Sequence, residues 1–241
     1  MEDYLFEGNI SVKAAVMGGM REVMEIIADE NKRDKDTRWI LHRAAERGIP
    51  IRRTSREEID AAASGHTHGG LLARCGARRF QPLDDLAEKG RFLALIEGIE
   101  DPFNFGMILR TLYASGCDGV VLPPRNWTSA AAIVARASAG ASEHLSMTIA
   151  EDMETTIAAL KDQGIALICA DRKDARCLYD YSFPDRLCLA IGGEMRRLSD
   201  TVRSASDQNV YIPYGREVRS ALSAVSASAV FAFEILRQRK Y

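Results

Sequence analysis

Three short segments of this 241-residue chain contain the side chains and glycines that could bind a ligand and act on it. Each segment follows a predicted strand. The first contains Asn104 and Arg110, the second Gly192, Gly193 and Glu194, and the third Ile212, Ser220 and Ser223. An arginine supplies a fixed positive charge, because its guanidinium stays protonated in proteins. Paired glycines let a backbone approach a ligand closely. Open parallel sheets bind ligands at their strand ends, so the segments predict a ligand site there.

Each segment also has a purely structural interpretation. Asn104 could cap a helix N-terminus, Arg110 could be a surface or salt-bridging arginine, and the glycine pair could form an ordinary turn. Asn104 and Arg110 lie six residues apart, so they are not on adjacent turns of one helix face. We expect Asn104 to reach a ligand from the start of the helix and Arg110 to project from its body.

The common nucleotide and hydrolase motifs are absent from the sequence. No G-x-G-x-x-G follows a strand, and there is no G-x-x-x-x-G-K-[ST], G-x-S-x-G or H-E-x-x-H. His66 and His68 supply two metal ligands with no third ligand in view, so we predict no metal site. An NAD-dependent oxidoreductase on an ordinary doubly wound sheet therefore lacks its main sequence support.

The elements that must position the three segments alternate between strand and helix from Arg91 onward. Apolar runs predict strands at 92–97, 119–122, 145–149, 165–170, 187–191 and 210–213. Helical stretches are predicted at 104–115, 129–138, 151–163 and 220–238. Parallel neighbours need such crossovers, and strands buried on both faces are nearly all apolar. Residues 86–241 are therefore predicted to form a parallel-sheet domain of the α/β class.

Residues 1–85 predict a second, smaller α/β domain. Apolar residues at helical spacing predict a helix from Val12 to about Glu30, followed by helices at 39–47 and 55–63. Short strands are predicted at 49–51 and 71–73. Residues 81–90 contain Pro82 and Gly90 and predict a linker.

Composition excludes several classes of protein. Thirty-two Lys and Arg against 34 Asp and Glu give a net charge of −2, so bulk charge alone does not hold nucleic acid. No apolar run is long enough to cross a membrane, and the acidic N-terminus is unlike a signal peptide. Five scattered cysteines without a Cys-x-x-Cys pair suit reduced thiols, and we expect a cytoplasmic protein.

Together and in this order, the three segments resemble the motifs of the SpoU (TrmH-type) branch of the SPOUT RNA methyltransferases. Asn104-x-Gly106-x-x-x-Arg110 looks like the first motif, 191–194 like the second, and 212–234 like the third. Residues 137–144 resemble the helix and turn between the first two motifs. Residues 1–85 are similar to the ribosomal-protein-like RNA-binding domain of the 23S rRNA guanosine-2′-O-methyltransferase subgroup.

The resemblance implies an RNA 2′-O-ribose methyltransferase whose C-terminal domain has a deep trefoil knot and which forms a homodimer. Its knotted loops would hold S-adenosyl-L-methionine near five residues, namely Leu122, Gly192, Gly193, Ile212 and Leu222. Arg110 would stabilise the developing alkoxide and hold the adjacent phosphate. Asn104 would orient Arg110 or the ribose, and Glu194 would hold the first-motif side chains or the cofactor loop. An apolar stripe on the last helix, from Leu222 through Leu236, could form the dimer contact or cover its own sheet.

The third motif departs from the family pattern. The family usually has Ser-Leu-Asn where this chain has Ala221-Leu222-Ser223, so Ser220 or Ser223 would have to supply the missing polar group. A neighbouring residue on a helix points about 100° away. These departures favour an alternative hypothesis, a catalytically impaired RNA-binding relative.

The RNA partner is predicted to be structured RNA, with 23S rRNA ahead of tRNA. Five arginines cluster around the strands of the smaller domain and could dock RNA through its phosphates: Arg52, Arg53, Arg74, Arg78 and Arg79. They could equally form a solvated surface.

Overall fold

A computed structural model describes residues 3–65, 67–124, 127, 130–217 and 220–240. The chain divides into two compact units, which we describe separately. The first contains Met1–Arg79 and Trp127–His144, and the second contains Phe80–Asn126 and Leu145–Tyr241. Among the described residues, no helix is long and apolar enough to span a membrane.

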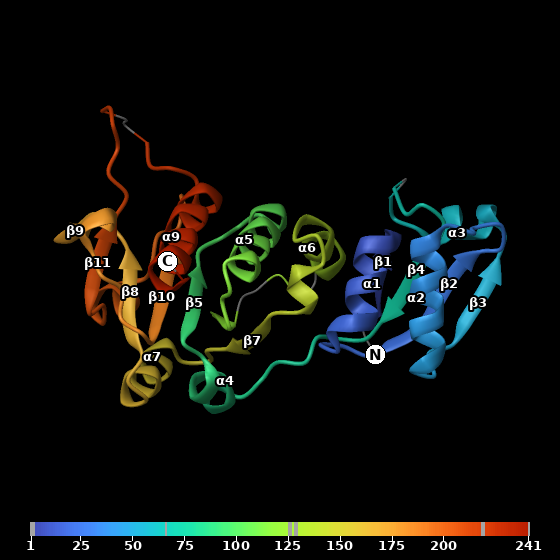
Figure 1. The fold of residues 1–241 in the computed structure, drawn as a ribbon, viewed down its shortest axis with the longest axis horizontal. Helices are drawn as coiled ribbons and strands as arrows, with labels where there is room; N and C mark the ends of the chain where they lie inside the picture. The colour runs from blue at the N-terminus through green and yellow to red at the C-terminus, as the bar shows by residue number, and fades with distance from the viewer. Residues whose placement is uncertain (1–2, 66, 125–126, 128–129, 218–219, 241) are drawn as a thin grey trace. The chain divides into compact units, whose positions relative to one another are not determined.

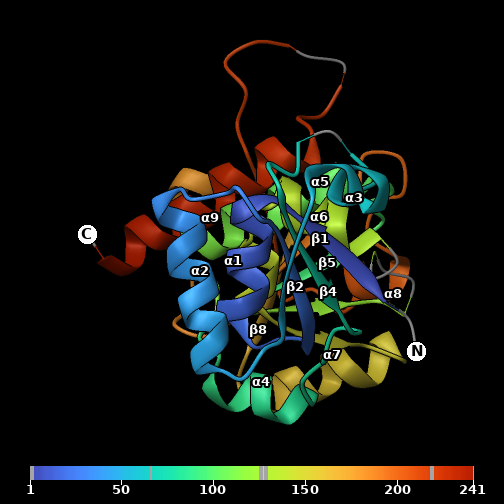
Figure 2. The same ribbon diagram turned by 90° about the vertical axis from the view of Figure 1, so that its right-hand side faces the viewer.

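The first unit has a mixed four-stranded sheet with strand order β1-β4-β2-β3. Its elements are β1 (Tyr4–Glu7), α1 (Gly8–Gly18), β2 (Val23–Asp29), α2 (Lys35–Glu46), β3 (Ile51–Thr54), α3 (Arg56–Ala62), β4 (Leu71–Cys75), α6 (Ala131–Ala137) and a 3-10 turn at Ala141–Glu143. Helices α1 and α2 lie side by side (Figure 2). Alternate residues of β2 point to opposite faces, so Ile26 packs with α1 and α2 while Ile27 packs with Ile59 of α3.

The helix predicted from Val12 to Glu30 is wrong over its second half, where the structure has strand β2. The helical spacing before residue 18 is real, but Gly19 adopts a left-handed conformation (φ +69°) and ends α1. Strand β1 was not predicted, and the stretch predicted as a linker contains α4 (Leu83–Lys89). These short apolar runs have no distinctive period of their own, so tertiary packing determines whether each forms a helix or a strand.

The second unit has a seven-stranded sheet with strand order β7-β6-β5-β10-β8-β11-β9. All its strand pairs are parallel, which confirms the predicted parallel sheet. The strands are β5 (Phe92–Glu97), β6 (Gly119–Leu122), β7 (Ser146–Ile149), β8 (Ala166–Ala170), β9 (Ala175–Cys177), β10 (Leu187–Gly192) and β11 (Gln208–Tyr211). The helices are α4, α5 (Pro102–Ala114), α7 (Met153–Asp162), α8 (Asp200–Ser204) and α9 (Ala224–Lys240), with a 3-10 turn at Leu178–Asp180. Helices α5 and α9 cover one face and α4 and α7 the other (Figure 1), where α8 packs against α7. This arrangement brings the ends of β5 and β10 together at the centre of the sheet.

The segments that follow these two strands contact each other closely through their backbones, and we call this contact the chain crossing. Gly193 N donates to Glu97 O at 2.9 Å, and Ser199 N donates to the Glu97 carboxylate at 2.7 Å. A Cβ on Gly193 would lie 1.8 Å from Gly98 O, and one on Gly98 would lie 1.8 Å from Arg196 O. Only glycine fits either position, because any side chain would require the two backbones to separate.

Candidate active site

A cavity of about 500 Å³ opens at the carboxyl ends of β8, β10 and β11. Its wall combines strand-end residues with the segment that leads into α9, and the described part of this segment extends away from the sheet in Figures 1 and 2. The lining includes apolar side chains (Ile191, Leu198, Ile212, Leu222 and Phe231) and polar ones (Asp171, Arg172, Glu194, Arg197, Tyr214 and Ser220). The volume and the mixed lining are typical of a site for a small organic ligand.

Six of the predicted site residues line this cavity. They are Gly192, Gly193, Ile212 and Leu222 from the predicted cofactor set, together with Glu194 and Ser220. Ser223 is not among the lining residues, and its hydroxyl instead accepts from Ser226 N at 3.2 Å and caps α9. Leu122 is buried at the end of β6 and is also outside the lining. The functional roles of all these residues remain predictions.

The two glycines of the second motif are required by close contacts within the chain, which the sequence did not predict. A Cβ on Gly192 would lie 2.6 Å from Leu198 N, and Gly193 meets Gly98 as described above. The close approach that requires glycine is therefore to the chain itself. Its consequence for a ligand is indirect, because the crossing holds 194–198 as one wall of the cavity.

Sequence analysis missed a contact between Tyr214 and the start of the third motif. The Leu222 backbone N–H donates to the Tyr214 hydroxyl at 2.8 Å, and the Arg172 guanidinium lies 4.1 Å from the centre of the Tyr214 ring. Both Tyr214 and Arg172 line the cavity. Asp171 was missed too, although it comes directly after β8 and the strand-end rule could have found it.

Asn104 and Arg110 both lie on α5, and neither is among the cavity's lining residues. The cap of α5 is Asp101, whose carboxylate accepts from Phe103 N at 3.1 Å and Asn104 N at 3.3 Å. The alternative interpretation of Asn104 as the cap is therefore wrong. Arg110 is exposed and follows Phe103 and Met107 along one helix face, at spacings of four and three residues. Phe103 is 54% exposed, Met107 46% and Tyr113, three residues beyond Arg110, 48%, so the arginine lies within an exposed, largely apolar stripe.

The five predicted RNA-binding arginines have different environments. Arg52 pairs with Glu25 and Glu58, and Arg74 pairs with Asp3. The Arg78 side chain is 5% exposed and lies 3.6 Å from the Glu143 carboxylate, and burial lowers its pKa to about 10. Arg53 contacts backbone carbonyls, and Arg79 is exposed. These environments distinguish the five, but whether any of them contacts RNA remains a prediction.

Only one histidine of the pair in the small unit, His68, belongs to the described residues. His66 lies outside the described residues. His68 is buried, its Nδ1 accepts from Gly70 N at 3.2 Å, and its Nε2 lies 3.1 Å from the Asp60 carboxylate. Both ring nitrogens are thus used in structural contacts. No group of three potential ligands for a metal occurs among the described residues.

The fold and the cavity define an α/β protein with a ligand site at the carboxyl edge of a parallel sheet. The sequence profile of the SpoU rRNA Methylase family matches residues 91–233. A second profile, described as RNA 2′-O ribose methyltransferase substrate binding, matches residues 5–81. The chain therefore belongs to the SpoU family of RNA 2′-O-ribose methyltransferases. Membership implies the trefoil knot.

Individual relatives cover nearly the whole chain. A Staphylococcus haemolyticus protein named for the TrmH family of tRNA/rRNA methyltransferases is 29% identical over 99% of this chain and 97% of its own length. The fold is shared with the SpoU methyltransferase AviRb of Streptomyces viridochromogenes, solved with AdoMet (TM-score 0.81, 22% identity, 98% of this chain and 90% of that one). It is also shared with an AdoMet-bound rRNA methyltransferase of Sinorhizobium meliloti (TM-score 0.82, 17% identity, 99% and 88%).

Proposed function

We propose that this protein transfers a methyl group from S-adenosyl-L-methionine to a ribose 2′-hydroxyl of ribosomal RNA, with 23S rRNA as the substrate to test first. The observation that carries the proposal is the cavity, which gathers residues of the second and third family motifs in a chain whose two parts match the catalytic and substrate-binding profiles. The two AdoMet-bound structures that share the fold support the choice of cofactor. We also propose a cytoplasmic location, supported by five free cysteines of which four are buried.

The residues present fit such a cofactor. Ile191, Ile212 and Leu222 offer apolar surface for a heterocycle, while Asp171 and Glu194 offer carboxylates for hydroxyl and amino groups. When bound, S-adenosyl-L-methionine supplies a methyl group on a sulfonium, which is already a good leaving group. The protein must then hold donor and acceptor in line, which can lower the barrier by several kcal/mol.

Arg110 is proposed to act on the RNA rather than on the cofactor. A guanidinium stays protonated, so it would stabilise negative charge developing on the 2′-oxygen and hold the adjacent phosphate instead of serving as a base. Asn104, on the same helix, would orient the arginine or the ribose. Glu194, which lines the cavity, would position the cofactor loop.

We further propose that the active protein is a homodimer formed through α5 and α9, which pack against each other. Each presents exposed apolar side chains, including Met107 on α5 and Phe233, which is 48% exposed, on α9. Covering these faces would bury Arg110 at the boundary between subunits, where it could complete the partner's cavity. Met107→Glu is expected to yield monomers in analytical ultracentrifugation and to abolish transfer.

Methyl transfer from tritium-labelled cofactor to 23S rRNA and, separately, to bulk tRNA tests the proposal. Arg110→Ala is expected to reduce transfer at least a hundredfold with little change in cofactor affinity, while Arg176→Ala, an exposed arginine on β9, serves as the control. Cofactor binding without transfer to either RNA would favour the impaired relative that Ala221 and Ser223 suggest. Transfer to tRNA alone would reassign the substrate, and full activity of Arg110→Ala would refute the mechanism.

A further inference from the structure

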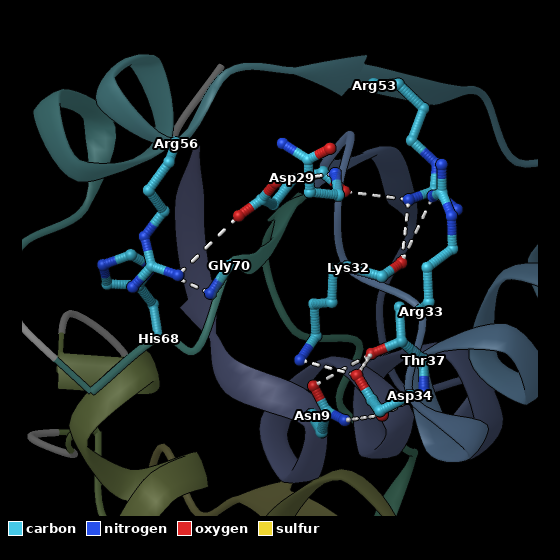
Figure 3. Close-up of polar contacts among 11 residues, drawn as sticks. Asn9, Asp29, Lys32, Arg33, Asp34, Thr37, Arg53, Arg56, His68 and Gly70 are labelled. Carbon is cyan, nitrogen blue, oxygen red and sulfur yellow. Dashed lines mark hydrogen bonds and ion pairs between the residues drawn. The ribbon is translucent and has the colours of Figure 1, made fainter.

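The loop that follows β2 in the first unit carries two arginines that meet at one backbone oxygen. Arg53, on the neighbouring strand β3, donates from Nη1 to Asp29 O at 2.9 Å and to Lys32 O at 3.3 Å. Arg33 donates from Nη1 to the same Lys32 O at 3.5 Å. Figure 3 shows the two side chains converging on this carbonyl from different elements. Two positive charges are therefore held close together.

These two arginines differ from the other cations around them. Lys32 pairs with Asp34 at 2.8 Å (Figure 3). Arg56 pairs with Asp60 at 2.8 Å. Within the part of the chain that the structure describes, no carboxylate lies within ion-pair distance of Arg33 or Arg53. Their contacts are to carbonyl oxygens, which carry only partial charge.

An exposed pair of like charges without a counter-ion favours a bound anion. Each guanidinium offers five N–H donors in a planar fork, and the hydrogen bonds of Arg33 and Arg53 to these carbonyls use only Nη1 of each. The remaining donors are available to an external acceptor. A phosphate matches the fork geometry and presents several oxygens, so one phosphate can be held by both groups.

We propose that Arg33 and Arg53 together clamp a single phosphate of the RNA backbone when the first unit docks its substrate. The proposal rests on the proposed function, because the matched substrate-binding profile, residues 5–81, contains both arginines. It selects one arginine of the five predicted from sequence, Arg53, and adds Arg33, which sequence analysis did not single out. Arg52 is excluded from the clamp because its guanidinium pairs with Glu25 and Glu58.

The test measures RNA affinity of the full-length protein as a function of salt, using 23S rRNA and bulk tRNA as probes. Each phosphate contact contributes about 0.7–0.9 to the slope of log K against log salt. Arg33→Gln and Arg53→Gln are each expected to weaken binding roughly tenfold at low salt and to lower the slope by up to one contact. The double variant is expected to lose only one contact, since both groups hold the same phosphate.

Arg43→Gln, on helix α2 of the same unit, is the matched control: its guanidinium pairs with Glu46 at 2.8 Å, so affinity and slope should stay unchanged. Arg53 also anchors the loop through Asp29 O, whereas Arg33 has no such anchoring contact, so Arg33→Glu provides a variant that preserves the fold. Unchanged cofactor affinity in each variant confirms an intact second unit. A slope loss of two contacts in the double variant, or no loss in any variant, overturns the clamp.

The same series separates this proposal from the proposed function. Methyl transfer and RNA binding that are insensitive to Arg33 and Arg53 overturn the clamp alone. Weakened RNA binding in the variants, with no transfer by the unmodified protein, supports the clamp and overturns the catalytic proposal. Inorganic phosphate, titrated calorimetrically, is expected not to bind; if it binds and the variants keep their RNA affinity, the pair belongs to a free anion and the clamp is overturned.

Discussion

Replacing Glu143 by Gln should destabilise the first unit strongly, because it removes the negative charge from a buried cluster. The Glu143 carboxylate is 2% exposed and accepts from Arg21 Nε at 2.7 Å and Nη2 at 3.2 Å, with Arg78 Nη1 at 3.6 Å. Arg21 is buried as well, at 3% exposure. The variant would remove the charge of Glu143 from the buried guanidinium of Arg21 and from its contact with Arg78. Removing one partner of a buried ion pair costs about 3–5 kcal/mol, and we expect the lower end because glutamine keeps one acceptor oxygen.

Urea unfolding measures this loss. With a slope of about 2 kcal/mol per M, a loss of about 3 kcal/mol moves the midpoint down by about 1.5 M. Glu46→Gln is the control: its carboxylate also pairs with an arginine, Arg43, at 2.8 Å, but is 45% exposed, so no resolvable shift is expected. A loss below about 1 kcal/mol for Glu143→Gln, the range of a surface pair, would refute the argument that this cluster depends on its charge balance.

Gly193→Ala should prevent stable folding, because its Cβ would lie 1.8 Å from Gly98 O, whereas Gly215→Ala, with open space around it, should fold normally; soluble yield and thermal melting compare them. Tyr214→Phe removes one hydrogen bond of about 1 kcal/mol from the cavity wall and should weaken S-adenosyl-L-methionine binding about fivefold in calorimetry, so unchanged affinity would show that the contact is dispensable. Iodoacetamide at pH 8 should modify only Cys177 in the native protein, since burial raises the thiol pKa of the other four cysteines, to about 11 or higher, and keeps them protonated; mass spectrometry detects any second site.

The second unit was predictable from sequence because its strands are buried on both faces. A run such as Phe92–Glu97 has apolar residues at nearly every position, and the helical stretches between such runs leave only parallel pairing. The short strand β9 was not predicted, since its three residues, Ala175–Cys177, are partly exposed and give no apolar run. Burial on both faces, rather than propensity, made the other strands visible.

The first unit was harder to predict because its strands are short and only partly buried. Val23, Ile26 and Ile27 fit a helix as well as a strand, and the boundary depends on Gly19, which ends α1 before them. The sequence also gives no sign that residues 127–144 pack with the first unit rather than the second. That association includes the buried ion pair between Glu143 and Arg21, 122 positions apart in the chain, and the packing of Ala131 and Ala135 into the core of the first unit.

The candidate site was predictable where it depends on strand ends and not where it depends on loops. Glu194 and Ile212 lie where parallel strands end, so the general rule for open sheets finds them. The hydrogen bond from Leu222 N to the Tyr214 hydroxyl joins two residues between β11 and α9, and no periodic sequence pattern predicts such a contact. The partners of charged side chains were equally unpredictable from the sequence. Arg52 and Arg53 are adjacent, yet Arg52 pairs with carboxylates and Arg53 donates to backbone carbonyls.

The glycines of the second motif show how a correct residue can be chosen for an incomplete reason. Sequence analysis attributed Gly192 and Gly193 to a close approach of the backbone to a ligand, but the atoms that exclude a side chain are Leu198 N and Gly98 O. A variant at either glycine would therefore disturb the chain crossing before it disturbed a ligand, and loss of cofactor binding there would not identify the site. Glu194 and Leu222 line the same cavity with exposed side chains. Substitutions at these two positions separate binding from folding, because they change the cavity wall and leave the contact between the two strand ends in place.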